Sequence, residues 1–166
     1  IYLTNRDSHI TIEDNVIFHA YGFGVHCYSY SDRNYVRDFT IRGNVWFSNG
    51  APSRYRLFDN CMVGHDGSHV VSGIRLEANY GWAQSLDARD VRLGWDTPNE
   101  DATLIDNYFV GQTIFQETWT SIDMRSNTFI GPVSGVNTAS HPDNEYLTEP
   151  PSTNHVVLSE NRFQPG

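Results

Sequence analysis

Lysine is absent from this sequence, and cysteine is scarce. The 11 basic residues are all arginines, scattered along 166 residues whose formal net charge is −9. Nucleic-acid-binding proteins cluster their basic residues on one face, so nucleic acid is not an expected partner. Cys27 and Cys61 are too few for a disulfide framework and wrongly spaced for a zinc site. Because both lie in apolar, strand-like runs, we predict that they are small buried hydrophobes.

Long apolar runs are also missing, since no stretch approaches the roughly 20 residues that cross a bilayer. We therefore expect no membrane span. The chain shows no leader peptide and no initiator Met, and it opens at Ile1 in a strand-like run, so we expect upstream sequence to be missing. Separately, we expect the protein to be extracellular or at the cell surface. The length suits one domain over residues 1–166, and abundant Gly, Asn, Ser, Thr and Asp favour a turn-rich β fold.

Asparagine recurs in a fixed apolar context. Ile, Leu or Met stands three positions before each repeated Asn, and residues between the apolar positions are mostly polar, which predicts half-buried strands. In six of seven repeats an apolar residue two positions after the Asn begins a second strand, with Gly81 as the exception. The repeated asparagines are Asn15, Asn44, Asn60, Asn79, Asn107, Asn127 and Asn161.

This repeat predicts an all-β, right-handed, single-stranded parallel β-helix, a solenoid of about seven coils. Each Asn would occupy the bend in the left-handed backbone region, and the stacked amides would form a ladder. The irregular intervals suit coils with variable loops. A β-sandwich is the alternative, but its hairpins would favour Asn-Gly or Asp-Gly turns. Residues 132–154 break the repeat with several prolines, so we expect an irregular loop excursion there.

The segments Ile10–Phe18 and Phe39–Phe47 resemble repeats of the right-handed parallel β-helix, or pectate-lyase-like, superfamily. So do residues 102–111 and 122–131. The resemblance implies a fold of three short sheets, with a substrate groove lined by the strand that follows the loop after the Asn turn. Members include polysaccharide lyases, glycoside hydrolases, sugar epimerases and phage tailspikes, so the shared fold does not transfer one reaction.

The strands expected to line that groove begin near Gly24, Asp90 and Thr113. If Val25, Cys27, Val91 and Leu93 point inward, alternation turns three candidate catalytic residues outward. A lyase or epimerase needs a base for the proton beside a uronate carboxylate and a partner for the developing enolate. The candidates for these roles are His26, Tyr28 and Arg92.

The stretch from Tyr21 to His26 is similar to the Y-G-F-D-P-H element of mannuronan epimerases. Tyr21, Gly22, Phe23 and His26 match it, whereas Gly24 replaces the Asp and Val25 replaces the Pro. Losing that carboxylate removes a residue that the family uses at its site. The alternative is that the glycines shape a turn and His26 is a solvated strand residue.

An acidic cluster follows the fourth repeat. Paired carboxylates beside an aromatic ring are typical of glycosidases, which makes Asp87, Asp90 and Asp96 candidates together with Trp95. The same oxygens could bind Ca²⁺, or they could be solvated turn residues. We also place Trp119 and Glu117 among the ligand-binding candidates, and we expect Trp46 and Phe109 to stack in the core.

His65, Asp66 and His69 invite a metal interpretation, but the glycines around them indicate a loop that would not hold both His rings on one face, so we expect no metal site. Two functions remain open. One is a secreted polysaccharide lyase or uronate epimerase, or a hydrolase, acting on an acidic glycan. The other is a non-catalytic glycan-binding or structural scaffold. Uncapped coil ends would also allow self-association.

Overall fold

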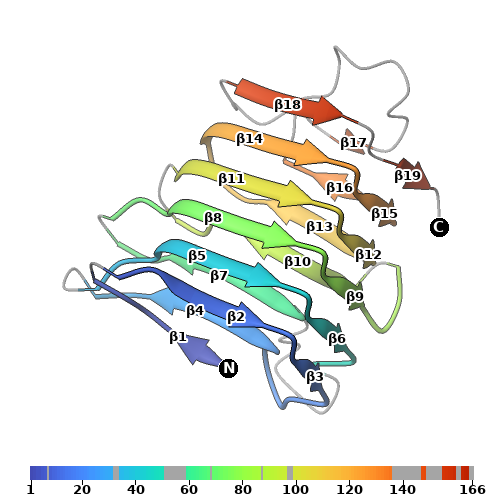
Figure 1. Cartoon of the computed structure of the whole chain (residues 1–166), viewed down its shortest axis with the longest axis horizontal. Coiled ribbons are helices and arrows are strands. Elements are labelled where there is room, and N and C mark those ends of the chain that lie inside the picture. Colours follow the sequence, from blue (N-terminus) through green and yellow to red (C-terminus); the bar gives the residue numbers. More distant parts are fainter. Residues whose placement is uncertain are drawn as a thin grey trace.

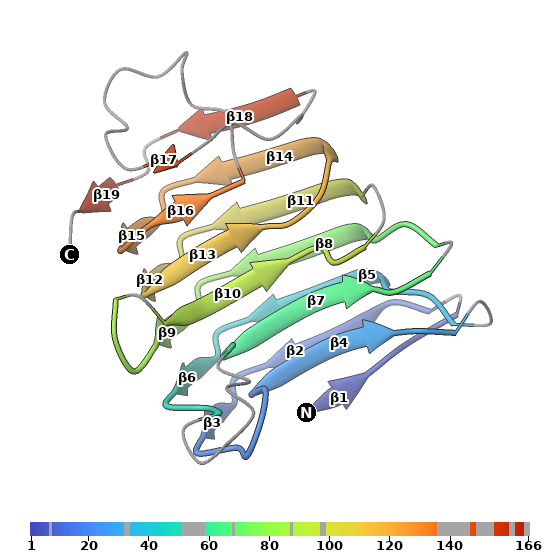
Figure 2. The same cartoon turned by 180° about the vertical axis from the view of Figure 1, so that it is seen from behind.

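The computed structural model describes residues 1–166 except 7, 32–33, 51–58, 68, 87, 97–98, 136–146, 149–154, 160–161 and 165–166. Three parallel sheets run along a stack of coils, and β1 and β19 lie at opposite ends of it (Figure 1). Seen from behind, a second sheet faces the viewer (Figure 2). None of the described residues forms a helix that could cross a lipid bilayer.

Each sheet takes one strand from every coil. Sheet I contains β1 (Tyr2–Leu3), β4 (Val25–Ser29), β7 (Cys61–His65), β10 (Arg89–Leu93), β13 (Gln112–Phe115), β16 (Val133–Ser134) and β17 (Leu147–Thr148). Sheet II contains β2 (Ile10–Glu13), β5 (Arg37–Arg42), β8 (Ser72–Glu77), β11 (Asn99–Ile105), β14 (Trp119–Arg125) and β18 (His155–Ser159). Sheet III contains β3 (Val16–Phe18), β6 (Val45–Phe47), β9 (Tyr80–Trp82), β12 (Tyr108–Val110), β15 (Thr128–Ile130) and β19 (Arg162–Gln164).

The predicted parallel β-helix is confirmed. From β2 to β16 the chain visits sheets II, III and I in that order five times, and β18 and β19 continue the pattern. The register also follows the repeat, because Ile12, Ile41, Leu76 and Leu104 align across sheet II. The loop excursion expected over 132–154 falls largely outside the described residues, and β16 and β17 within it pair with each other in sheet I.

The asparagine ladder is present, and each step is closed by two hydrogen bonds. The backbone N–H and side-chain Nδ2 of one Asn both donate to Oδ1 of the Asn in the next coil, at 2.8–3.1 Å. The ladder runs through Asn15, Asn44, Asn79, Asn107 and Asn127. Asn161 lies outside the described residues.

Asn60 is not a rung of this ladder, so the chain has fewer coils than the seven that the repeat suggested. It belongs to a second, shorter stack between sheets III and I, where Asn49 Nδ2 donates to Asn60 Oδ1 at 2.8 Å. Asn60 Nδ2 in turn donates to Asp90 Oδ1 at 2.7 Å. Met62, two residues after Asn60, consequently lies in sheet I rather than sheet III. The apolar spacing around Asn60 imitates the repeat without belonging to it.

The bend at each ladder Asn also differs from the prediction. The residue with positive φ is the one before the Asn, namely Asp14, Gly43, Ala78, Asp106 and Ser126, with φ between 52° and 64°. That residue makes the left-handed turn, and the following Asn points its amide inward along the stack. The preceding position therefore carries the backbone strain, which short polar residues and glycine tolerate best.

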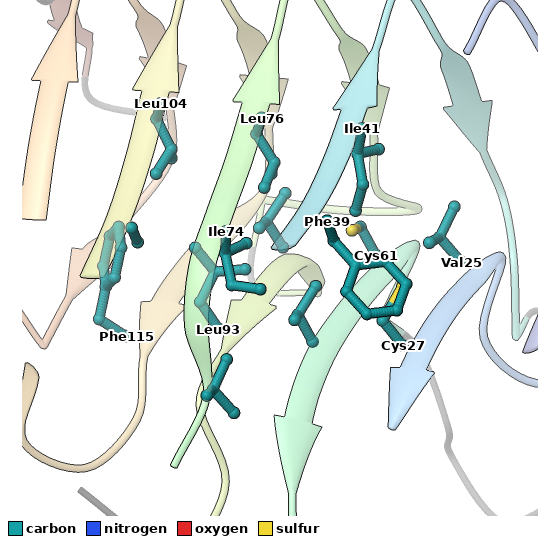
Figure 3. Packing of buried hydrophobic residues seen from close by; sticks show 14 of the residues in the cluster. Val25, Cys27, Phe39, Ile41, Cys61, Ile74, Leu76, Leu93, Leu104 and Phe115 are labelled. Atoms are coloured by element: carbon teal, nitrogen blue, oxygen red, sulfur yellow. The ribbon is translucent and has the colours of Figure 1, made fainter. Parts of the chain in front are cut away.

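Apolar side chains from all three sheets fill the interior. Cys27 and Cys61 are free and fully buried, as predicted, and Figure 3 shows them beside Phe39. Trp46 and Phe109 stack as expected, with ring centroids 5.9 Å apart. Gly81 lies between their strands because a Cβ there would collide with the Asp90 carboxylate and the Trp46 indole nitrogen. Gly81, the exception in the repeat, thus leaves room for a buried hydrogen bond in which Trp46 Nε1 donates to Asp90 Oδ1 at 3.0 Å.

Candidate functional site

Sheet I turns three of the predicted catalytic residues away from the core. Val25, Cys27, Val91 and Leu93 are buried in the core, and alternation turns His26, Tyr28 and Arg92 to the other side. The register places His26 opposite Met62 and Met62 opposite Arg92. Because neighbouring strands lie about 4.8 Å apart, His26 and Arg92 belong to one row that spans three coils.

Aromatic rings surround His26. Its imidazole lies 4.1 Å from the Phe23 ring and 5.1 Å from the Tyr28 ring, measured between centroids. The Tyr2 ring contacts it edge-on at 5.1 Å. Trp95 extends the cluster, with its ring 6.2 Å from Tyr28 and nearly perpendicular to it. We call these five residues the aromatic cluster of sheet I.

Arg92 lies under this cluster in a network of ion pairs. Its guanidinium bonds to Asp59 and lies 4.5 Å from the centroid of the Trp95 ring. Arg89 Nε also contacts Asp59, at 2.6 Å. Burial raises the pKa of Asp59, and the two arginines oppose that rise. Arg89 and Arg92 thus share Asp59, while Asp66 and Asp96 place negative charge near Tyr28 in the same cluster.

The protonation states of His26 and Tyr28 are set by their surroundings. Burial, reinforced by the charge of Arg92, lowers the pKa of His26 to about 4. The imidazole is therefore neutral at pH 7 and able to accept a proton. Burial, together with the hydrogen bond from Tyr28 Oη to Asp66 Oδ2 at 3.1 Å, raises the pKa of Tyr28 to about 12. The phenol keeps its proton and remains a donor.

The other site candidates are distributed differently. Asp90 and Trp119 are fully buried, so neither side chain lines the outer face. Asp96 is exposed, and its charge acts on Tyr28. Glu117 is exposed in the turn after β13, next to Gln116, whose Nε2 donates to the Trp95 carbonyl oxygen at 2.8 Å. Asp87 lies outside the described residues.

Sequence reasoning missed the residues that reach the cluster from other segments. Tyr2 and Asp66 meet it only because parallel strands bring their segments beside β4, and Asp59 reaches Arg92 across a separation of 33 residues. Phe23 belongs to the Y-G-F element, but nothing in that motif indicated its contact with His26. Gly24 has a structural reason, since a Cβ would lie 2.6 Å from Asn49 Nδ2 and from the Asn60 carbonyl oxygen. An Asp at that position would force the Asn60 backbone and the Asn49 amide to shift.

Metal ligands do not converge in the described part of the chain, where no group of three or more His, Cys, Asp or Glu side chains could hold an ion. His65 is buried, and its Nε2 lies 3.1 Å from the Asn34 carbonyl oxygen. His69 contacts the rings of His65 and Tyr35. These contacts account for the two histidines as packed residues.

No protein-family model, no curated protein sequence and no solved structure matches this chain. Function therefore has to be argued from the site itself.

Proposed function

We propose that this chain binds an acidic polysaccharide across the outer face of sheet I and transfers protons at the ring carbon beside a carboxylate, as a lyase or uronate epimerase does. The observation that carries the proposal is the meeting of a neutral His26, a protonated Tyr28 and the positively charged Arg92 on one face. These are the roles that the reaction needs: a base, an acid and a cation for the enolate. Such a glycan implies an extracellular or cell-surface site of action.

In this mechanism His26 accepts the proton from the ring carbon. The phenol of Tyr28 donates its proton to the leaving glycosidic oxygen, as a lyase requires. The guanidinium of Arg92 is the cation that stabilises the enolate oxygens. The aromatic cluster of sheet I supplies flat apolar surface for a sugar ring and keeps water from the base.

Non-catalytic glycan binding is the second candidate, and a specific observation favours it. Arg92 is only 6% exposed and already bonds to Asp59. A substrate carboxylate would have to share the guanidinium, whereas the exposed parts of Tyr28 and Trp95 can contact a sugar without it.

One experiment separates the two functions. The chain is incubated with a panel of polyuronates, and binding, the ultraviolet absorbance of an unsaturated product, and solvent deuterium incorporation are measured. Product or exchanged deuterium supports the enzyme, and binding alone supports the scaffold. Absence of binding to every acidic glycan in the panel refutes the enzyme and also refutes a scaffold that binds acidic glycans.

Variants test the assigned roles. His26→Gln should lower the rate by about 10²–10⁴-fold, as expected for loss of a general base, while the exposed His9→Gln serves as its control. Tyr28→Phe should act similarly, with Tyr30→Phe as control because Tyr30 is 76% exposed just beyond β4. The wild-type rate should rise through pH of about 4 and then stay level to alkaline pH, following the His26 and Tyr28 pKa values. A rate that stays constant on lowering the pH through this value would argue against His26 as the base.

Salt dependence gives an independent check. The net charge of −9 repels an anionic chain at long range, so moderate salt should strengthen binding by screening that repulsion. Binding that weakens steadily with salt would instead indicate a dominant attraction to exposed arginines.

A further inference from the structure

The outer face of sheet III carries an apolar surface that the proposed function does not use. Two residues of each strand from β3 to β15 face outward, and none of these described residues is charged. Five of them are large apolar residues that are at least 37% exposed: Val16, Phe18, Val45, Tyr80 and Trp82. An exposed apolar patch of this kind marks a binding surface.

Two pairs of stacked aromatic rings lie on this surface. Phe18 and Phe47 stack face to face, with centroids 5.2 Å apart and planes 5° from parallel. Tyr80 and Tyr108 stack at 4.8 Å and 3°. The first pair joins β3 to β6 and the second joins β9 to β12, so the boundary between β6 and β9 lies between the two stacks.

A slot opens at that boundary. It has a volume of about 260 Å³ and is lined by Val45, Phe47, Ser48, Tyr80 and Trp82. Phe47 and Val45 form one wall, and Tyr80 and Trp82 form the other. The side chains that line the slot offer three polar groups: the hydroxyls of Ser48 and Tyr80 and the indole N–H of Trp82.

We propose that this slot binds a neutral pyranose ring of a glycan. Such a ring has apolar C–H faces that suit aromatic walls and a rim of hydroxyls that can bond to Ser48, Tyr80 and Trp82. A charged sugar would find no counter-ion among the described outward residues of this face. A second copy of the chain would bring a further net charge of −9 toward the first. The site lies on a different sheet from His26 and does not depend on its activity.

The test uses the neutral hexasaccharides cellohexaose, xylohexaose and mannohexaose as probes, titrated into the full chain by calorimetry. At least one should bind, and Trp82→Ala should weaken that binding about tenfold or more, a loss of roughly 1.4 kcal/mol. Tyr80→Phe separates the hydroxyl from the ring and should cause a smaller loss. Thr128→Ala, on the same face but outside the slot, is the matched control and should bind like the wild type. Because Trp82 is 53% exposed, its removal should leave the urea midpoint unchanged.

Three outcomes would overturn the proposal. The first is that none of the three sugars binds at millimolar concentration. The second is that binding survives Trp82→Ala but is lost with Tyr28→Ala, which would place the sugar on sheet I. The third is a dimer in sedimentation experiments that Trp82→Ala dissociates, which would make this face an interface between two copies. Loss of activity on polyuronates alone would affect only the proposed function of sheet I.

Discussion

Replacing Asn79 with Ala tests whether the amide ladder holds the coils together. The Asn79 side chain makes four hydrogen bonds in the buried interior. It donates to the Ile41 carbonyl oxygen and to Asn107 Oδ1, and it accepts from the backbone and side-chain nitrogens of Asn44. At about 1 kcal/mol for each bond, the variant should lose about 4 kcal/mol of unfolding free energy.

The matched control is Asn15→Ala at the first rung. Asn15 is partly exposed, and its side chain makes two of these bonds, to the Glu13 carbonyl oxygen and Asn44 Oδ1. Water can replace them, so this variant should lose about 1 kcal/mol. Urea unfolding followed by circular dichroism and by tryptophan fluorescence measures both losses, and two probes are needed because solenoids can unfold one segment at a time. Equal losses for the two variants would refute the view that the buried amides stabilise the stack.

Three further predictions concern the interior. Gly81→Ala should lower the unfolding free energy by about 2 kcal/mol, because the added methyl group collides with the Asp90 carboxylate and the Trp46 indole; an unchanged urea midpoint would show that the two side chains can move aside. Burial raises the pKa of Asp90 to about 8 from its ordinary 3.8. Between pH 3.8 and about 8 the Asp90 carboxyl is therefore protonated in the folded state and ionised in the unfolded state. The free energy of unfolding consequently falls as the pH rises through this range. Asp90→Asn removes this pH dependence, so the stability of the variant relative to the wild type should increase from pH 4 to pH 8 in urea titrations. A stability difference that stays constant over this range would mean that Asp90 is ionised in the folded state. Burial also raises the pKa of Cys27 to about 12 and that of Cys61 well above its usual value. An aromatic disulfide reagent should therefore modify neither thiol until urea unfolds the chain. Rapid labelling of the native protein would contradict their burial.

Much of the site's protonation chemistry follows from contacts that no local pattern encodes. The sequence indicated that His26, Tyr28 and Arg92 would share one outward face, because alternation along a strand is a local property. It could not indicate that Arg92 bonds to Asp59 or that Tyr28 bonds to Asp66, since those pairs are 33 and 38 residues apart. Association through the coil ends stays a prediction.

The sequence by itself determined the parallel β-helix and most of the apolar residues in its core. Alternation of apolar and polar residues defines each strand, and an Asn at a constant distance after the strand defines the bend. Both signals are local, because each lies within one short segment such as Ile10–Phe18. The tertiary structure alone decided which bends stack. Asn60 has the same local spacing as Asn79, yet it joins Asn49 and Asp90 at another corner, because coil lengths set the partners of each amide. The same stacking decided that Asp90 and Trp119 are buried and that the rings of sheet III leave a slot between β6 and β9.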